Sequence, residues 1–133
     1  MWPWMIVVDV NHGISALLLV PSVYGLTNKR LANALALLGT AYEMSYEIQD
    51  LCVNFYIRYT CGKKAKPNVF LASLLLHHSV SFMTVLPMNL YYGEEYNYHR
   101  IVHSMLLGSV ILGFVNEFQK TLNVKKKNHL ILM

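Results

Sequence analysis

Charged side chains are scarce in this sequence. Asp, Glu, Lys and Arg make up 14% of its 133 residues, whereas about 25% is usual for a soluble globular domain. Apolar residues account for 55%, and the mean hydropathy is +0.36. This balance excludes an ordinary soluble domain. It also argues against nucleic acid as a partner, because basic residues of a membrane protein are expected to cluster in loops on one side. The composition predicts a small integral membrane protein.

Cysteine is scarce as well. Cys52 and Cys61 stand nine residues apart and form no CxxC pair, which excludes a disulfide framework and a zinc knuckle. We expect both to be free thiols. The N-terminal segment MWPWMIVVDVNHG lacks a basic stretch and a small-residue cleavage site, so we do not expect it to be a removable signal peptide.

The sequence contains four long apolar segments. Each is close to the ~20 residues that a helix needs to cross the hydrocarbon core of a membrane, although the last one is short enough to lie at the interface. The sequence therefore predicts an all-α, multi-pass transmembrane helical bundle of about four spans within residues 1–118, followed by a basic C-terminal tail at 119–133. The four predicted spans are 6–26, 31–57, 68–90 and 100–118.

Basic residues are unevenly distributed between the two sides that four spans would create. Eight of the eleven fall on the side of the termini and of the turn between the second and third spans, and only Lys29, Arg30 and Arg100 fall on the other. Basic loops stay in the cytoplasm or the mitochondrial matrix. The distribution predicts an endoplasmic reticulum or mitochondrial inner membrane protein with both termini on that side. The eight residues are Arg58, Lys63, Lys64, Lys66, Lys120, Lys125, Lys126 and Lys127.

Three acidic residues interrupt the second apolar segment. Glu43, Glu47 and Asp50 are spaced four and three residues apart, which places them on one stripe of a helix; Tyr46 lies one turn before Asp50. One ionised carboxylate near the bilayer centre costs ~2.5–3.5 kcal/mol even on a lenient scale. The stripe must therefore face protein, water or a ligand.

Two adjacent histidines, His77 and His78, occupy the third apolar segment. If the second and third segments form a hairpin that turns near Gly62, a rise of ~1.5 Å per residue brings Asp50 or Glu47 to the depth of this pair. His12 enters from the same side and is expected to join the cluster. A purely structural role, in which these side chains hydrogen-bond between helices or at a subunit interface, remains open.

No metal or cofactor is predicted for this cluster. The histidine spacings of membrane di-iron enzymes are absent from the sequence. A haem held by two histidines from different helices remains a second possibility for the same residues.

Three fragments, HGISALLLVPSVYGL, GTAYEMSYEIQDL and LLLHHSVSF, follow one another in this order. Their order and spacing resemble those of TLC-domain membrane proteins, which include the ceramide synthases. The resemblance covers residues 12 to 82 and implies a helical, lipid-handling bundle. It also implies a polar lipid cavity, for which His103 is a further candidate. The matching positions are His12, Tyr46, Asp50, Leu51, His77 and His78.

Catalysis by this family requires more than the chain supplies. His77 or His78, oriented by Asp50, has the residue types of a general base for acyl transfer. Ceramide synthases, however, continue to a second histidine followed by aspartates, whereas His103 is followed by SMLL. We therefore expect a lipid-binding protein without enzymatic activity, with membrane lipids and other membrane subunits as partners. The alternatives are a supernumerary structural subunit of a respiratory, ATP-synthase or photosynthetic complex, and a lipid acyltransferase of the ceramide-synthase type.

Overall fold

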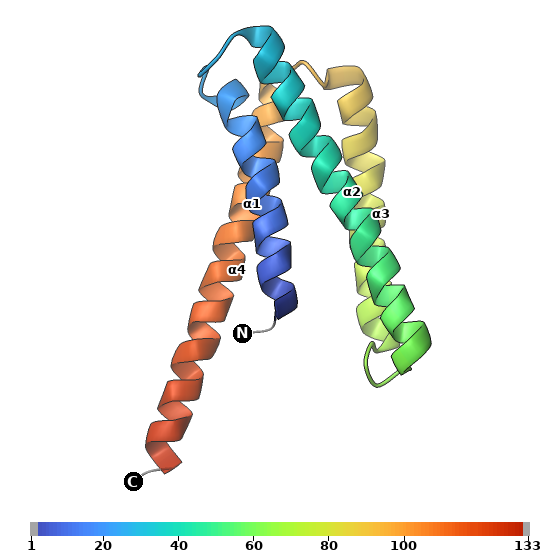
Figure 1. Cartoon of the computed structure of the whole chain (residues 1–133), viewed down its shortest axis with the longest axis vertical. Coiled ribbons are helices and arrows are strands. Elements are labelled where there is room, and N and C mark those ends of the chain that lie inside the picture. Colours follow the sequence, from blue (N-terminus) through green and yellow to red (C-terminus); the bar gives the residue numbers. More distant parts are fainter. Residues whose placement is uncertain (1–2, 132–133) are drawn as a thin grey trace.

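The computed structural model describes the backbone of residues 3–131, and the side chains of residues 6–120 and of residue 122. It consists of four helices, and residues 3–131 contain no β-strand (Figure 1). The all-α prediction is confirmed. The helices are α1 (Pro3–Val23), α2 (Lys29–Cys61), α3 (Asn68–Tyr92) and α4 (Tyr96–Ile131).

The turns between the helices follow local sequence signals. Gly25 and Gly62 adopt positive φ angles of 65° and 78°, which cost glycine little because it has no Cβ. The N–H of Gly62 bonds to the carbonyl of Arg58 and ends α2. The Asn28 side chain accepts a 3.0 Å hydrogen bond from the Leu31 N–H and begins α2, as an N-cap residue does.

The fourth helix corrects the prediction of a short last span. Its apolar stretch runs from Tyr96 to Lys120, a length of 25 residues. The helix then continues to Ile131, so the predicted boundary at residue 119 coincides with no break in the backbone. Neither proline nor glycine occurs between residues 119 and 131. The segment therefore lacks the residues that usually end a helix.

Two helix pairs make up the bundle. α1 packs against both α2 and α4, and α2 packs against α3 on its other side. The α1–α4 pair and the α2–α3 pair meet near the turns at 24–28 and 93–95 and diverge toward the other end (Figure 1). That other end holds both ends of the chain and the turn at 62–67. This arrangement agrees with the alternating directions that four consecutive spans require.

Small residues allow α1 and α2 to approach closely where the pairs meet. A Cβ added to Gly39 would lie 2.9 Å from both Ser15 O and Leu19 Cδ1, so the space on α1 is already filled. Close helix contacts of this kind are typical of membrane bundles. The buried apolar core at this crossing consists of Ala16, Leu19, Ala36, Tyr98, Val102 and Leu106.

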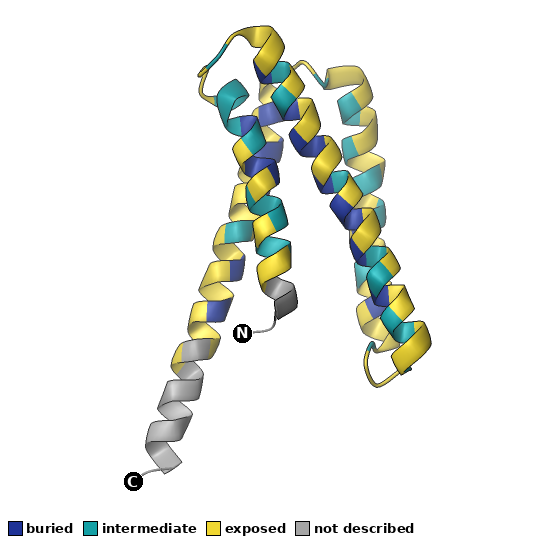
Figure 2. Ribbon diagram, in the orientation of Figure 1, coloured by how far each residue is buried: buried dark blue, intermediate teal, exposed yellow. Residues whose placement is uncertain are grey.

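Many large apolar residues are exposed on the outside of the bundle, and Figure 2 shows exposed positions along all four helices. Three helices are long and apolar enough to cross a membrane: α1 over Ile6–Val23, α3 over Asn68–Tyr92 and α4 over Tyr96–Lys120. The structure thus has three such helices, whereas about four were predicted. α2 differs from the others because it carries the acidic stripe of Glu43, Glu47 and Asp50.

Candidate functional site

The histidine–carboxylate contact predicted from the hairpin is present between α2 and α3. His78 Nε2 lies 3.0 Å from Asp50 Oδ2, and both residues are 5% exposed. The other oxygen, Asp50 Oδ1, accepts a 2.9 Å hydrogen bond from Asn54 Nδ2. Asn54 sits one turn along α2, so helix geometry alone brings it to Asp50. This prediction from sequence is confirmed.

Glu47 contacts the same histidine from the next turn of α2. Its Oε2 lies 3.8 Å from His78 Nδ1, which is ion-pair distance but too long for a hydrogen bond. Its Oε1 accepts a 2.6 Å hydrogen bond from Ser81 Oγ. Ser81 was not predicted as a site residue. Its spacing of three residues from His78 on a helix is the signal that places both on one face.

Glu43 faces the opposite neighbour, α1. Its Oε1 lies 2.7 Å from His12 Nδ1, which is within ion-pair distance. The His12 ring also meets Tyr46 edge to face, with centroids 6.1 Å apart. Buried Tyr46 Oη has no hydrogen-bond partner among the described residues. The acidic stripe therefore faces protein on two sides: α1 at Glu43, and α3 at the two later carboxylates.

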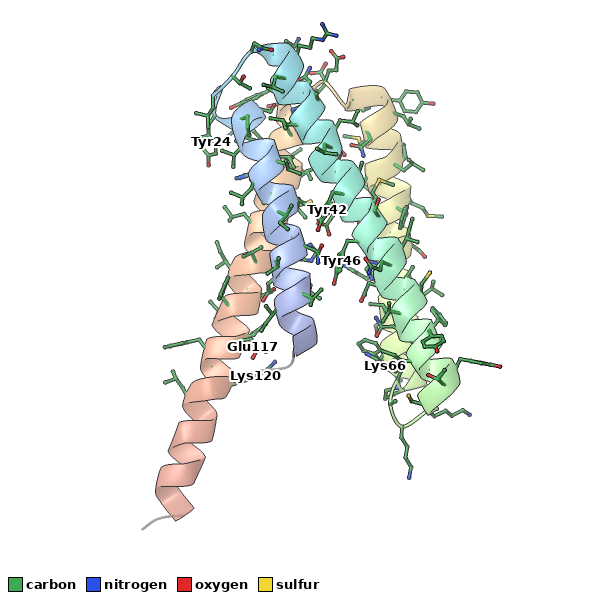
Figure 3. The ribbon with its side chains drawn as sticks, in the orientation of Figure 1. Tyr24, Tyr42, Tyr46, Lys66, Glu117 and Lys120 are labelled. Carbon is green, nitrogen blue, oxygen red and sulfur yellow. The ribbon has the colours of Figure 1, made fainter. Side chains whose placement is uncertain are left out.

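A cleft of about 460 Å³ lies between the two helix pairs, beside this cluster. Its volume falls within the ~300–1,000 Å³ that is usual for small-molecule sites. Figure 3 shows Lys66 and Lys120 at the same level, on opposite sides of the space between the pairs. The lining residues come from all four helices and the turn at 62–67: Val8, His12, Tyr46, Glu47, Asp50, Lys66, Phe70, Leu74, His77, His78 and Lys120.

The two lysines of the cleft are held by their neighbours. Lys66 Nζ lies 4.6 Å from the centroid of the Phe70 ring, a cation–π distance. Lys120 Nζ lies 2.8 Å from Glu117 Oε1, and its side chain stays 57% exposed. The basic end of the cleft is thus formed by one cation from each helix pair.

The remaining predicted histidines occupy two different environments. His77 is exposed, lines the cleft and meets the ring of His78 at 5.3 Å between centroids. His103 is buried against Tyr24, with ring centroids 5.9 Å apart. Tyr24 follows His12 by twelve residues, or ~18 Å along a helix axis. His103 therefore lies outside the cluster, although the resemblance implied that it belonged there.

Sequence reasoning also missed a hydrogen-bonded histidine at the opposite end of the bundle. His99, 1% exposed, lies with Nδ1 2.6 Å from Ser22 Oγ and Nε2 2.8 Å from Gly93 O. Because a carbonyl only accepts, a neutral His99 carries its proton on Nε2 and accepts the Ser22 hydroxyl at Nδ1. The contact joins α1, α4 and the turn between α3 and α4.

The site is thus a buried histidine–carboxylate network beside an amphipathic cleft in a helical bundle. Such an arrangement can bind a polar group inside an apolar environment, and His78 with Asp50 has the orientation of a base and its carboxylate partner. No three His, Cys, Asp or Glu side chains in the described part of the chain are grouped to hold a metal ion. No family model matches the sequence, and neither a curated protein nor a solved structure shows significant similarity to it.

Proposed function

We propose that this chain is an integral membrane protein in which all four helices cross the membrane and the cleft binds a membrane lipid. The fourth crossing, by α2, is supported by where its charges lie. Between residues 31 and 57 the only charged side chains are Glu43, Glu47 and Asp50, and all three are buried inside the bundle. The outward face of α2 over this range therefore presents no charge to lipid. The free-energy cost of exposing a charged side chain to the hydrocarbon core does not arise for this helix.

The proposed orientation places both termini on the cytoplasmic or matrix side, in the endoplasmic reticulum or the mitochondrial inner membrane. It rests on the eight basic residues at the end of the bundle that carries the termini and the turn at 62–67. Single cysteines at Lys64 and Asn128, in a chain without Cys52 and Cys61, should react with an impermeant maleimide from the same side. Reaction from opposite sides would eliminate the four-span arrangement.

The observation that carries lipid binding is the chemistry of the cleft walls. Apolar side chains such as Val8, Phe70 and Leu74 line it together with the buried polar cluster and two lysines at one end. A ligand that matches these walls has a long apolar part and a polar head. Membrane lipids have this composition, and they reach a site between transmembrane helices from the surrounding bilayer.

We also propose that the chain is related to TLC-domain proteins and lacks their catalytic activity. Five positions of the resemblance line one cleft although 66 residues separate the first from the last: His12, Tyr46, Asp50, His77 and His78. This clustering supports the resemblance, and the position of His103 away from it supports a non-catalytic protein. The proposed role is lipid binding, alone or as a subunit of a larger membrane complex.

Lipid retention tests the proposal directly. The full chain, extracted in mild detergent, should retain lipid that mass spectrometry detects in the intact complex. Leu74→Trp, which fills the cleft from α3, should release it, whereas Leu75→Trp on the lipid-facing side should not. Equal lipid content in both variants would contradict lipid binding in the cleft. Migration with other proteins in the same extract would assign the chain to a complex.

A further inference from the structure

The polar groups of the cleft lie at two separate depths. Lys66 is at the basic end, and His77 and His78 follow it by eleven and twelve residues on the same hairpin arm, ~18 Å along the α3 axis. Phe70 and Leu74 occupy the wall between them. The cleft is therefore polar at its mouth, apolar along its middle and polar again near its inner end.

The mouth is suited to an anion. Lys66 and Lys120 line it from the two helix pairs, and the exposed Lys63 and Lys64 add positive charge at the adjacent turn. Glu117 already contacts Lys120, so a bound anion would share this lysine rather than take it alone. At a membrane surface such a position meets the carboxylate or phosphate of an amphipathic lipid.

The inner end is suited to a neutral polar group. His77 is exposed, lines the cleft, and makes no hydrogen bond with the described residues. His12 faces the same space and keeps 18% of its side chain exposed. Two buried polar atoms of cleft-lining residues, Tyr46 Oη and Glu47 Oε2, have no hydrogen-bond partner among the described residues. A hydroxyl group both donates and accepts, so it can bond to a neutral imidazole and to these atoms after a small side-chain rotation.

Resting on the proposed lipid binding, we infer that the cleft selects a single-chain anionic lipid with a hydroxyl group far along its chain. The carboxylate lies between Lys66 and Lys120, the methylene chain passes Phe70 and Leu74, and the hydroxyl contacts His77 and the polar cluster behind it. The apolar middle excludes a second polar group near the head. The cleft volume of about 460 Å³ suits one chain.

Three acids of equal chain length test this selection: stearate, 2-hydroxystearate and 12-hydroxystearate. Equilibrium binding of each radiolabelled acid is measured with the full chain in phosphatidylcholine nanodiscs. We expect 12-hydroxystearate to bind about tenfold more tightly than the other two, the effect of one added hydrogen bond. His77→Leu should reduce the three affinities to a common value, while Thr84→Val, a change outside the cleft on the same helix, should leave the preference intact.

The anionic end is tested separately. Lys120→Gln should weaken all three acids about tenfold, as expected for loss of a charge-assisted contact, and Lys64→Gln, outside the cleft lining, should change them less than twofold. Equal binding of the three acids overturns the inferred hydroxyl selectivity and leaves lipid binding standing. Absence of acid binding while the purified chain retains other lipid overturns the ligand class alone. If neither acid nor retained lipid is found, the proposed function fails as well.

Discussion

Replacing His78 with alanine removes one of the two hydrogen bonds to the side chain of a buried carboxylate. Asp50 then keeps only the 2.9 Å bond from Asn54 to its Oδ1, and Oδ2 is left without a donor inside the bundle. The two residues are each 5% exposed, so the intact contact is shielded from water. The variant therefore tests whether the acidic stripe of α2 and the histidines of α3 stabilise each other inside the bundle.

Two limits bracket the expected loss. Breaking a buried ion pair on one side costs ~3–5 kcal/mol in soluble proteins, whereas interhelical hydrogen bonds in a membrane protein average only ~0.6 kcal/mol, because the unfolded chain also finds partners. Asn54 still donates a hydrogen bond to Asp50 Oδ1. The expected loss of unfolding free energy therefore lies between these two limits. We expect His78→Ala and Asp50→Ala each to lower the free energy of unfolding by ~2 kcal/mol.

The decisive comparison is the double variant. Asp50→Asn combined with His78→Leu removes the charge and its partner together, so it should recover about half of the single loss, ~1 kcal/mol. Unfolding is followed by far-UV circular dichroism during an SDS titration of the detergent-solubilised chain. His77→Ala is the matched control, since this neighbouring side chain is exposed and should cost less than ~0.5 kcal/mol. Additive losses in the double variant would refute mutual satisfaction of the pair.

Three further outcomes follow from other contacts. Gly39→Leu should separate α1 from α2 and lower the melting temperature by several degrees, since its Cβ would meet Ser15 O at 2.9 Å; Gly108→Leu, where the space is open, is the control. His99→Phe should cost ~1–3 kcal/mol in unfolding free energy, because it leaves Gly93 O without its donor. The purified chain should form no ceramide from a long-chain base and acyl-CoA, and should show no Soret absorbance; turnover lost in His78→Ala would contradict this.

Periodicity and spacing were enough to predict the helices and one central contact. Helix boundaries lie within a few residues of the apolar segments, apart from the end of α4, which continues to Ile131. The hairpin of α2 and α3 places Asp50 opposite His78 because both lie a similar number of residues from the middle of the turn at 62–67. Such a contact depends only on local sequence distance, which a linear sequence contains.

Contacts between distant segments were predicted less well. His103 and His12 both lie in apolar helices, yet His103 contacts Tyr24 and His12 contacts Glu43. Which face of α4 meets α1 is decided by packing at the crossing, and the helix's own sequence does not specify it. His99 was missed for the same reason, since its partner Ser22 is 77 residues away.

The acidic stripe of α2 lies beside the cleft and contacts two different helices. Glu43 is turned toward α1 while Glu47 and Asp50 are turned toward α3, so one helix face satisfies two partners that do not pack on each other along their length. The pairs α1–α4 and α2–α3 diverge toward the end of the bundle that carries the turn at 62–67 (Figure 1). The divergence leaves the polar side chains beside an opening lined by Val8 and Phe70. In the proposed four-span arrangement this opening faces membrane lipid, which connects the buried acidic residues of α2 to the proposed ligand site.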